Sequence, residues 1–380
     1  MTEKNKKVLI LHAPLGAGHG MAAKAIEEAF KKSYPDFEIK SISVLDFAFD
    51  IFRRGIPYAF NILSSRIPFL YKWMYEHFKR QSRHWTLNHA SDVILKGSNF
   101  VDFLNDFNPN FILSTNPLPM QLVSLTKQQK VIDILSANVC TDFGFHSLWY
   151  NSDVNYYFVA NENIKKALQN HGVNQEKIII TGIPISSRFI QPTDKSNVFK
   201  RLGLKENKLT LMIVGGTMEY NDLFKAVSEI QEKTQAQFII IAGRDKNLQK
   251  KLEKSDLKRY KDIKIFNFVD NIQDYMGVSD LILTKAGGLT VSECMQKELP
   301  MIITDFIPGQ EEDNVKYLVE NGAGLEAKNT NEAIKIVIDL FSNTEKIFAM
   351  KKNCKKIAKP DAAQKLVDFV ASKINNKKND

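Results

Sequence analysis

The apolar positions of this chain gather into short continuous runs, separated by stretches with the spacing of helices. In the first half, strand-like runs lie at 8–11, 111–114, 156–159 and 177–180, and a helical pattern at 21–30 follows the first of them. Strands that are apolar throughout, rather than at every second position, are typical of a parallel sheet with helices on both faces. The pattern therefore predicts an α/β fold.

The same pattern restarts in the second half of the chain. Further strand-like runs lie at 209–214, 238–243, 263–266, 281–284 and 300–304. Between the two series, at 190–194, a proline interrupts a polar stretch. A chain of 380 residues is too long for one ordinary core and suits two domains. We therefore predict two doubly wound domains, each with its own parallel sheet.

Charge and cysteine content narrow the class of protein. The formal net charge of +9 favours an anionic partner, such as nucleic acid, phospholipid headgroups or a phosphate-bearing substrate. Cys140, Cys294 and Cys354 lie far apart, so we expect neither a disulfide framework nor a zinc site. No stretch approaches the roughly 20 apolar residues that span a bilayer, and the first apolar run is too short for a signal peptide. We expect a soluble or peripheral protein of a reducing compartment.

A glycine-rich turn, Gly16-Ala17-Gly18-His19-Gly20, joins the first predicted strand to the first predicted helix. Glycine lets a backbone approach a ligand closely, and a helix start offers unpaired amides. A dinucleotide or ATP site is disfavoured, because Met21 stands where the fingerprint has a small residue and no P-loop lysine follows. His19 is either a general base or a histidine that merely hydrogen-bonds the loop.

The segment 51–85 combines cations with aromatic rings and contains a single acid, Glu76. Such a composition suits the headgroup level of an anionic membrane. Nucleic-acid binding uses the same ingredients, stacked rings and phosphate-directed cations. A third interpretation is a pair of ordinary amphipathic helices whose rings are buried in the core.

A second glycine turn, Gly287-Gly288, follows a buried strand and opens a helix. The free amides of such a helix start bind anions, and a diphosphate is the ligand that we expect there. Lys285 lies just before this turn, and Glu293 could accept hydrogen bonds from both hydroxyls of a ribose. Alternatively, Thr290 and Glu293 form a capping box, which would make the turn purely structural.

The same layout of strand, turn and polar helix start returns at 304–314. Gln310 and Glu311 carry side chains that are suited to hydrogen-bonding with sugar hydroxyls. Because two such loops at neighbouring strand ends mark the place where open α/β sheets collect ligands, they favour a nucleotide-sugar site.

These motifs resemble those of the UDP-sugar-dependent diacylglycerol glycosyltransferases, which include the processive diacylglycerol glucosyltransferases of Gram-positive bacteria and the monogalactosyldiacylglycerol synthases of plants. The resemblance covers almost the whole chain and is most specific at 284–293 and 307–314. It extends to 16–19, 140–149 and 181–185. The chain departs from the family at Gly215-Gly216, which lacks further glycines, and at Asn116, where histidine or phenylalanine is common.

The resemblance implies a GT-B fold, with two doubly wound Rossmann-like domains facing a central cleft. Residues 1–192 would form the acceptor and membrane-binding domain, and 193–380 the nucleotide-sugar domain. The last helix, about 357–375, could pack back on the N-terminal domain. Neither a metal ion nor a cofactor would be required, since the UDP-sugar is a co-substrate.

The resemblance also implies roles for individual residues. His19 is the candidate base, and Asp142 is a second candidate that either orients His19 or acts itself. The uracil would lie against Phe268-Val269. The candidate donor-binding residues are Gly18, Gly215, Arg244, Phe268, Val269, Lys285, Gly287, Gly288, Leu289, Thr290, Glu293, Gln310, Glu311 and Asn314. The candidate acceptor and membrane residues are Arg53, Arg54, Arg66, Trp73, Arg80, Trp85, His146 and Trp149.

The expected activity is inverting transfer of a hexose from a UDP-sugar, with UDP-glucose expected, to the hydroxyl of diacylglycerol or a glycosyl-diacylglycerol. We expect the protein to lie as a peripheral protein on the cytoplasmic face of an anionic membrane. We expect no nucleic-acid partner. One alternative is transfer of N-acetylglucosamine or another sugar to a polyprenyl-linked acceptor. Others are a non-catalytic UDP-sugar sensor and a nucleic-acid binder. Oligomeric state stays open.

Overall fold

The computed structural model describes residues 6–49, 53, 55, 57–59, 62–63, 67, 69–70, 73, 91 and 99–376. The chain divides into two compact units. Unit 1 comprises Met1–Ser187, Ile307–Asp313 and Lys359–Asp380, and unit 2 comprises Arg188–Phe306 and Asn314–Ala358. The sequence placed the change of domain between residues 192 and 193, whereas the chain enters unit 2 at Arg188.

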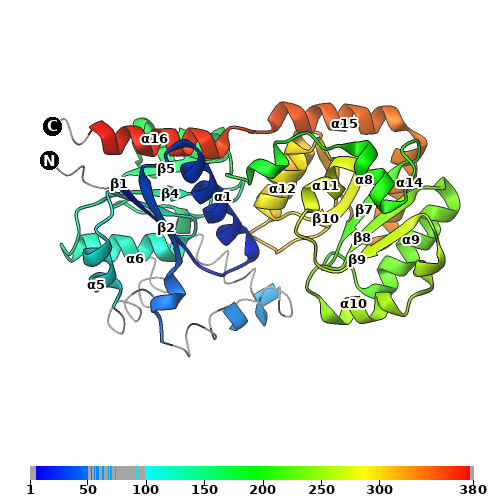
Figure 1. Ribbon diagram of the computed structural model, residues 1–380, viewed down its shortest axis with the longest axis horizontal. Coiled ribbons are helices and arrows are strands. Elements are labelled where there is room, and N and C mark those ends of the chain that lie inside the picture. Colours follow the sequence, from blue (N-terminus) through cyan, green and yellow to red (C-terminus); the bar gives the residue numbers. More distant parts are fainter. Residues whose placement is uncertain are drawn as a thin grey trace. The chain divides into compact units, whose positions relative to one another are not determined.

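Unit 1 is built on a parallel sheet of six strands in the order β2-β1-β3-β4-β5-β6 (Figure 1). The strands are β1 (Lys6–His12), β2 (Phe37–Ser43), β3 (Phe111–Ser114), β4 (Leu135–Val139), β5 (Tyr156–Val159) and β6 (Ile178–Ile180). Because the chain leaves β1 to one side for β2 and returns to the other for β3, the order of the sheet reverses between β1 and β3. Ligands of such sheets bind at the carboxyl ends of the strands around this point.

Helices cover both faces of this sheet. They are α1 (Ala17–Ser33), α5 (Phe100–Phe107), α6 (Pro117–Gln128), α7 (Glu162–Asn170) and α16 (Ala362–Asn376), with short 3-10 turns at Val44–Phe47, Ser147–Trp149, Gln175–Lys177 and Ser187–Phe189. The last helix, α16, packs along α1 (Figure 1). There Tyr34 donates its hydroxyl to Asp368 at 2.7 Å, and Val367 and Val370 share a core cluster with Phe30. The C-terminal helix is therefore part of unit 1.

Unit 2 repeats the architecture with six parallel strands in the order β12-β11-β10-β7-β8-β9. These are β7 (Thr210–Val214), β8 (Gln237–Ile241), β9 (Ile263–Phe266), β10 (Leu281–Lys285), β11 (Met301–Asp305) and β12 (Gly324–Glu326). The helices are α8 (Lys195–Leu202), α9 (Tyr220–Thr234), α10 (Lys246–Glu253), α11 (Ile272–Val278), α12 (Gly288–Gln296), α13 (Glu312–Glu320), α14 (Thr330–Ser342) and α15 (Thr344–Ile357), with a 3-10 turn at Asp256–Arg259. The predicted pair of doubly wound Rossmann-like domains is confirmed.

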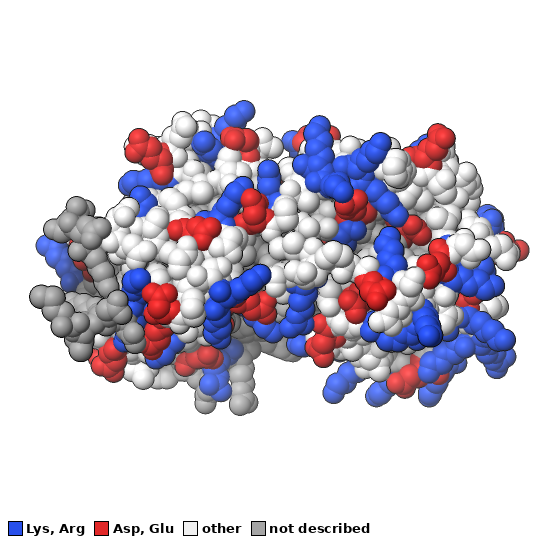
Figure 2. Space-filling model, turned by 45° about the horizontal axis from the view of Figure 1, so that its top comes forward, with Lys and Arg blue, Asp and Glu red and all other residues white. Residues whose placement is uncertain are grey.

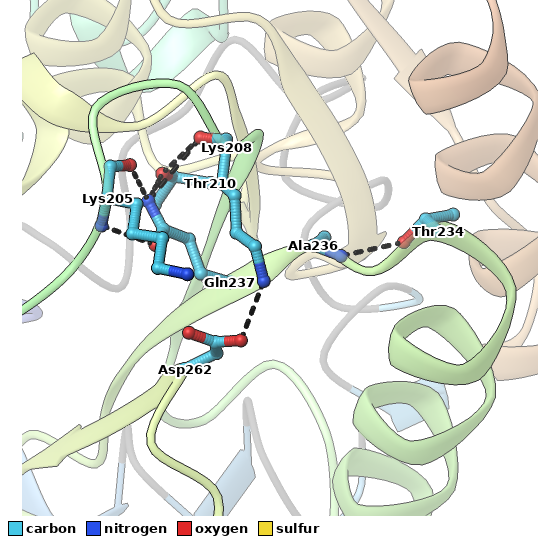
Figure 3. Close-up of polar contacts among 7 residues, drawn as sticks. All are labelled: Lys205, Lys208, Thr210, Thr234, Ala236, Gln237 and Asp262. Carbon is cyan, nitrogen blue, oxygen red and sulfur yellow. Dashed lines mark hydrogen bonds and ion pairs between the residues drawn. The ribbon is translucent and has the colours of Figure 1, made fainter.

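A buried amide ties the amino end of β8 to the chain that leads into β7 (Figure 3). The side chain of Gln237 is fully buried and donates to the carbonyl of Lys205 at 2.7 Å and to the hydroxyl of Thr210 at 2.9 Å. Its own carbonyl accepts from the Lys205 amide at 2.9 Å. Because buried polar groups cost stability unless they are bonded, this network secures the sheet at the end opposite the predicted site.

The positive charges of α15 are largely paired locally. Lys346, Lys351 and Lys355 form ion pairs of 2.7–2.9 Å, with Asp339, Asp280 and Glu298 respectively. Figure 2 shows blue and red side chains interspersed over one face of the molecule. We therefore interpret this lysine-rich helix as a solvated face of unit 2.

Within the described part of the chain, no helix combines the length and apolar character that crossing a bilayer requires.

Candidate functional site

The first candidate half-site lies at the carboxyl edge of the unit 1 sheet. Helix α1 begins at Ala17, and Gly16 before it adopts a φ of 89°, a conformation that side chains rarely tolerate. This tight turn makes His19 the third residue of α1. Thr115 follows β3 directly, and Thr141 lies two residues beyond the end of β4, so three neighbouring strand ends deliver side chains to one place.

His19 is enclosed by the ends of these strands. Its side chain is 8% exposed, and its Nδ1 lies 2.8 Å from the carbonyl oxygen of Thr115 and 3.0 Å from the hydroxyl of Thr141. The ring of Trp149 lies 6.3 Å away, centroid to centroid. Among the described residues, no hydrogen-bond partner contacts Nε2. The structure thus leaves one ring nitrogen for chemistry.

Burial is the main reason that the pKa of His19 is lowered, to about 4. The hydrogen bond to the Thr115 carbonyl opposes this shift, and the nearby His12 adds to it. The imidazole is therefore neutral at physiological pH, which is the state in which it can accept a proton.

The other predicted residues of unit 1 lie nearby in sequence but contact different groups. Asp142 is nearly buried beside Thr141, and its charge adds to the burial that raises the pKa of the Cys140 thiol. His146 is buried and accepts the Leu148 amide at 3.1 Å, so it caps the turn that carries Trp149. Asp142 as the orienting group of His19 stays a prediction, since the contacts that Nδ1 makes are to two threonines.

The aromatic segment is described at a few positions. Phe69 is 83% exposed and Trp73 58% exposed, and Tyr58 and Arg53 are also exposed. The expectation that such rings are buried between core helices is therefore wrong for these residues. Several large apolar side chains that are exposed within one segment of the chain favour an interaction surface. Four predicted members of the segment lie outside the described residues: Arg54, Arg66, Arg80 and Trp85.

The second half-site lies at the carboxyl edge of the unit 2 sheet. The predicted donor-binding residues follow four of its strands: Gly215 after β7, Arg244 after β8, Phe268 and Val269 after β9, and Lys285, Gly287, Gly288, Leu289, Thr290 and Glu293 at the end of β10. In Figure 1 these strands lie side by side in the sheet. The fold thus brings residues far apart in sequence to one edge.

Helix α12 begins without a capping side chain from the described residues. Gly287 is its N-cap residue and Gly288 its first residue, so Thr290 lies inside the first turn. The alternative capping box of Thr290 with Glu293 is therefore wrong. The amides of this helix start have no intrahelical partner, which is the arrangement that binds phosphates.

Two glycines bring the turn after β7 close to its neighbours. A side chain at Gly215 would collide with the carbonyl of Ala242, the residue after β8. Gly216 has a φ of 86°, and the side chain of Lys285 passes 3.8 Å from where its Cβ would be. Lys285 in turn forms an ion pair of 2.6 Å with Asp305 at the end of β11. Lys285 is thus held at the meeting point of β7, β10 and β11.

Glu293 lies one turn into α12, and burial raises the pKa of its carboxyl to about 8. The carboxyl is therefore mostly protonated at neutral pH in the ligand-free protein. A ligand whose hydroxyls donate hydrogen bonds to this carboxyl would favour its ionised form.

An exposed ring at the end of β9 has a cation stacked on it. Phe268 is 52% exposed, and the guanidinium carbon of Arg244 lies 4.6 Å from its ring centroid. An exposed aromatic face with a guanidinium beside it suits a planar heterocycle.

The predicted sugar-reading residues of the loop after β11 have structural contacts. The carboxylate of Glu311 accepts the amide of Ile307 at 2.7 Å, across a turn in which Gly309 has a φ of 85°. Gln310 lies on this turn and is partly exposed. Asn314 is fully buried and donates its side-chain amide to the carbonyl of Ala286 at 2.9 Å. Asn314 thereby supports the turn that carries Lys285.

Sequence reasoning missed two groups of polar residues. Thr115 and Thr141 contact His19 across 96 and 122 positions of sequence, which no local pattern indicates. A polar pocket of about 450 Å³ at the carboxyl ends of β7 and β11 is lined by residues that include Thr217, Asp222 and Thr304. A hydroxyl residue close after a buried strand was the signal common to Thr115, Thr141 and Thr217. Among the described residues, no three His, Cys, Asp or Glu side chains are grouped so that they could hold a metal ion.

Two family models match the chain, one in each half. Residues 19–185 match the model of monogalactosyldiacylglycerol (MGDG) synthase, and residues 210–366 match the glycosyltransferase family 28 C-terminal domain. Together they include His19, Thr141 and the turns that contain Gly287 and Gln310.

Curated relatives match over nearly the whole chain. A processive diacylglycerol beta-glucosyltransferase of Bacillus cereus is 28% identical over 378 residues, covering 97% of this chain and 94% of the relative. Monogalactosyldiacylglycerol synthase 1 of Arabidopsis thaliana, a chloroplastic protein, is 29% identical over 395 residues, covering 99% of this chain and 72% of the relative.

Among solved structures, a putative UDP-N-acetylglucosamine 2-epimerase from Listeria monocytogenes superposes with a TM-score of 0.67 at 16% identity, covering 98% of each chain. At this identity the likeness concerns the fold alone.

Proposed function

Because this chain belongs to glycosyltransferase family 28, together with the diacylglycerol glucosyltransferases and monogalactosyldiacylglycerol synthases, we propose that it transfers a hexose from a UDP-sugar to the hydroxyl of diacylglycerol or a glycosyl-diacylglycerol. The observation that carries this proposal is His19, a neutral and enclosed histidine whose Nε2 has no partner among the described residues. It supplies the base that the reaction requires.

In the proposed reaction, the acceptor oxygen attacks the anomeric carbon while its proton passes to Nε2 of His19. The bond between the anomeric carbon and the β-phosphate oxygen breaks, and UDP leaves. A single displacement of this kind inverts the anomeric centre. The amides at the start of α12 and the cation of Lys285 would compensate the charge that develops on the diphosphate, so the proposed reaction uses neither a metal ion nor a cofactor.

The donor in this proposal is UDP-glucose, in keeping with the named activity of the Bacillus relative. Phe268, with Arg244 stacked on it, would receive the uracil, and Glu293 the ribose hydroxyls. The hydroxyls of the hexose would hydrogen-bond to the turn that carries Gln310 and Glu311. The diphosphate would lie at the start of α12.

We further propose that the protein binds the cytoplasmic face of an anionic membrane as a peripheral protein. The exposed rings of Tyr58, Phe69 and Trp73, together with Arg53, support this. Such rings reside favourably at the headgroup level, and cations near anionic lipid each contribute about 1 kcal/mol. His146 and Trp149 are buried, so they suit the acceptor rather than the lipid surface.

The test is a transfer assay with diacylglycerol in anionic vesicles and UDP-glucose, UDP-galactose or UDP-N-acetylglucosamine, read by mass analysis of the lipids. The expected product is hexosyl-diacylglycerol, made most rapidly from UDP-glucose. Transfer to a polyprenyl-linked acceptor but not to diacylglycerol would contradict the proposed acceptor. Binding of UDP-sugar without transfer to any lipid would instead indicate a sensor.

A further inference from the structure

Two oxygens of different chemical kinds contact the same nitrogen of His19. The carbonyl oxygen of Thr115 lies 2.8 Å from Nδ1, and the hydroxyl oxygen of Thr141 lies 3.0 Å from it. A carbonyl oxygen can only accept a hydrogen bond, whereas a hydroxyl can donate or accept. The short carbonyl contact is therefore a hydrogen bond only if Nδ1 carries the ring proton.

The carbonyl of Thr115 belongs to a residue that is fixed to His19 by a reciprocal contact. The Thr115 hydroxyl donates to the backbone carbonyl of His19 at 3.0 Å, and the Thr115 amide donates to Leu11 of β1 at 3.0 Å. Thr115 is fully buried. Its position relative to the imidazole is thus set by the junction of β1, α1 and β3.

The surroundings of Thr141 also hold it in place. It is almost fully buried, and the amide of the preceding Cys140 donates to Phe158 of β5 at 2.9 Å. When Nδ1 carries the proton, the Thr141 oxygen accepts a share of this N–H. Both groups at Nδ1 are uncharged, and burial in this setting keeps the imidazole neutral.

We propose that Thr141, together with the carbonyl of Thr115, is a positioning residue that holds His19 as its Nδ1–H tautomer and presents an unprotonated Nε2 to the acceptor hydroxyl. The catalytic consequence rests on the proposed function. The tautomer itself does not, because it follows from the carbonyl contact at Nδ1.

The first experiment measures the tautomer in the whole protein. Ring ¹⁵N chemical shifts, with His19→Asn used to assign the signal among the seven histidines, should show Nδ1 as the protonated nitrogen at pH 7. A wild-type ring that is protonated at Nε2 overturns the proposal, whether or not any sugar is transferred.

The second experiment removes the Thr141 hydroxyl. Thr141→Val keeps the shape of the side chain and leaves the Thr115 carbonyl in place, so Nδ1 should stay protonated. Because the ring loses one of the two oxygens that orient it, kcat should fall about tenfold at an unchanged KM for the UDP-sugar, since one net hydrogen bond is worth a factor of this order. Thr141→Ser should restore kcat. The matched control is Thr126→Val, because Thr126 is also fully buried in unit 1 but bonds to Val123 at 2.8 Å.

The outcomes separate this inference from the proposed function. A Thr141→Val protein with the wild-type kcat would show that Thr141 does not position His19. Equal losses in Thr141→Val and Thr126→Val would reduce its role to stability, which also overturns the proposal. A wild-type ring protonated at Nδ1 in a protein that transfers no sugar would support the assigned tautomer and contradict the proposed function.

Discussion

The side chain of Asn314 donates to the carbonyl of Ala286 at 2.9 Å and thereby joins the start of α13 to the turn before α12. Asn314 is fully buried. Asn314→Ala would leave the Ala286 carbonyl without this partner, at a cost of about 1–3 kcal/mol in the free energy of unfolding. Because the same turn carries Lys285 and Gly287, we also expect UDP affinity, measured by titration calorimetry, to fall several-fold.

Asn353→Ala is the matched control for this prediction. Asn353 makes a similar bond to the carbonyl of Gly322, at 3.0 Å, elsewhere in unit 2. It should lower stability without changing UDP affinity. Equal UDP affinity in both variants would show that Asn314 does not support the donor turn.

Replacing His19 should separate chemistry from donor binding. His19→Ala is expected to lower kcat by about 100-fold or more, the usual contribution of a general base, while UDP affinity stays near normal. His171→Ala provides the control, because His171 is an exposed histidine of unit 1 that bonds to Ala167. Full activity of His19→Ala would exclude this residue as the base and would favour Asp142.

The lowered pKa of His19 predicts the shape of the pH profile. Because this pKa is about 4, His19 can accept a proton at any higher pH and loses this ability as the pH falls through 4. The acid limb of kcat/KM due to His19 should therefore lie near pH 4 rather than near the ordinary value of 6.5. The charges of His12 and Asp142 also act on this part of unit 1. The pH profile of kcat/KM should therefore be repeated in His12→Asn and Asp142→Asn. An acid limb at pH 6–7 that persists in both variants would contradict the assignment.

Glu293 should couple nucleotide binding to proton release. Its pKa of about 8 means that the ligand-free carboxyl is mostly protonated at pH 7, whereas acceptance of two ribose hydroxyls favours the carboxylate. Calorimetry in buffers of different ionisation enthalpy should detect protons released on UDP binding. Glu293→Gln should abolish this release and weaken binding about tenfold, since it loses one acceptor. Proton release that is unchanged in Glu293→Gln would assign it to another group.

The raised pKa of Glu293 also makes the free energy of unfolding depend on pH. Its folded-state pKa is raised above the ordinary 4.5, so the folded protein binds more protons than the unfolded chain between pH 4.5 and about 8. The free energy of unfolding contributed by Glu293 is therefore highest at low pH and decreases as the pH rises through this range. Glu293→Gln should flatten that part of the stability profile in chemical denaturation.

The exposed rings of unit 1 predict vesicle binding. Phe69→Ser and Trp73→Ser should each weaken binding to anionic vesicles by about tenfold or more, because an apolar side chain contributes on the order of 1.5–3 kcal/mol when it is buried. Phe348→Ser is the control, since Phe348 is 61% exposed on α15 of unit 2. Vesicle flotation measures the effect, and UDP affinity should not change. Equal loss in all three variants would indicate nonspecific adhesion.

The continuous apolar runs predicted most strands because those strands are buried on both faces. β2, β4 and β12 escaped this criterion for physical reasons. β2 alternates apolar and polar positions at the edge of its sheet, and the three-residue edge strand β12 buries only Gly324. β4 contains Ser136, whose hydroxyl accepts from Lys127, and Asn138, whose side-chain amide donates to the Trp149 carbonyl. The fold class was thus predictable, but strands that bury polar groups were not.

The site was predictable where the chain itself brings groups together. Gly287 at the start of α12 follows from a glycine turn between a strand and a helix. The alternative capping box failed because α12 begins before Thr290, which a sequence pattern cannot distinguish from a start at that residue. The contacts of His19 depend on the order β1-β3-β4, so they required the structure.

The return of α16 to unit 1 has a consequence for synthesis on the ribosome. Val367 and Val370 complete the cluster that contains Phe30 and Phe111, yet they leave the ribosome after the whole of unit 2. Unit 1 cannot complete its core before unit 2 has been synthesised, and its apolar surface stays open to solvent or to a chaperone until α16 emerges. A chain that stops before α16 would therefore be left with an unfinished first domain rather than a missing tail.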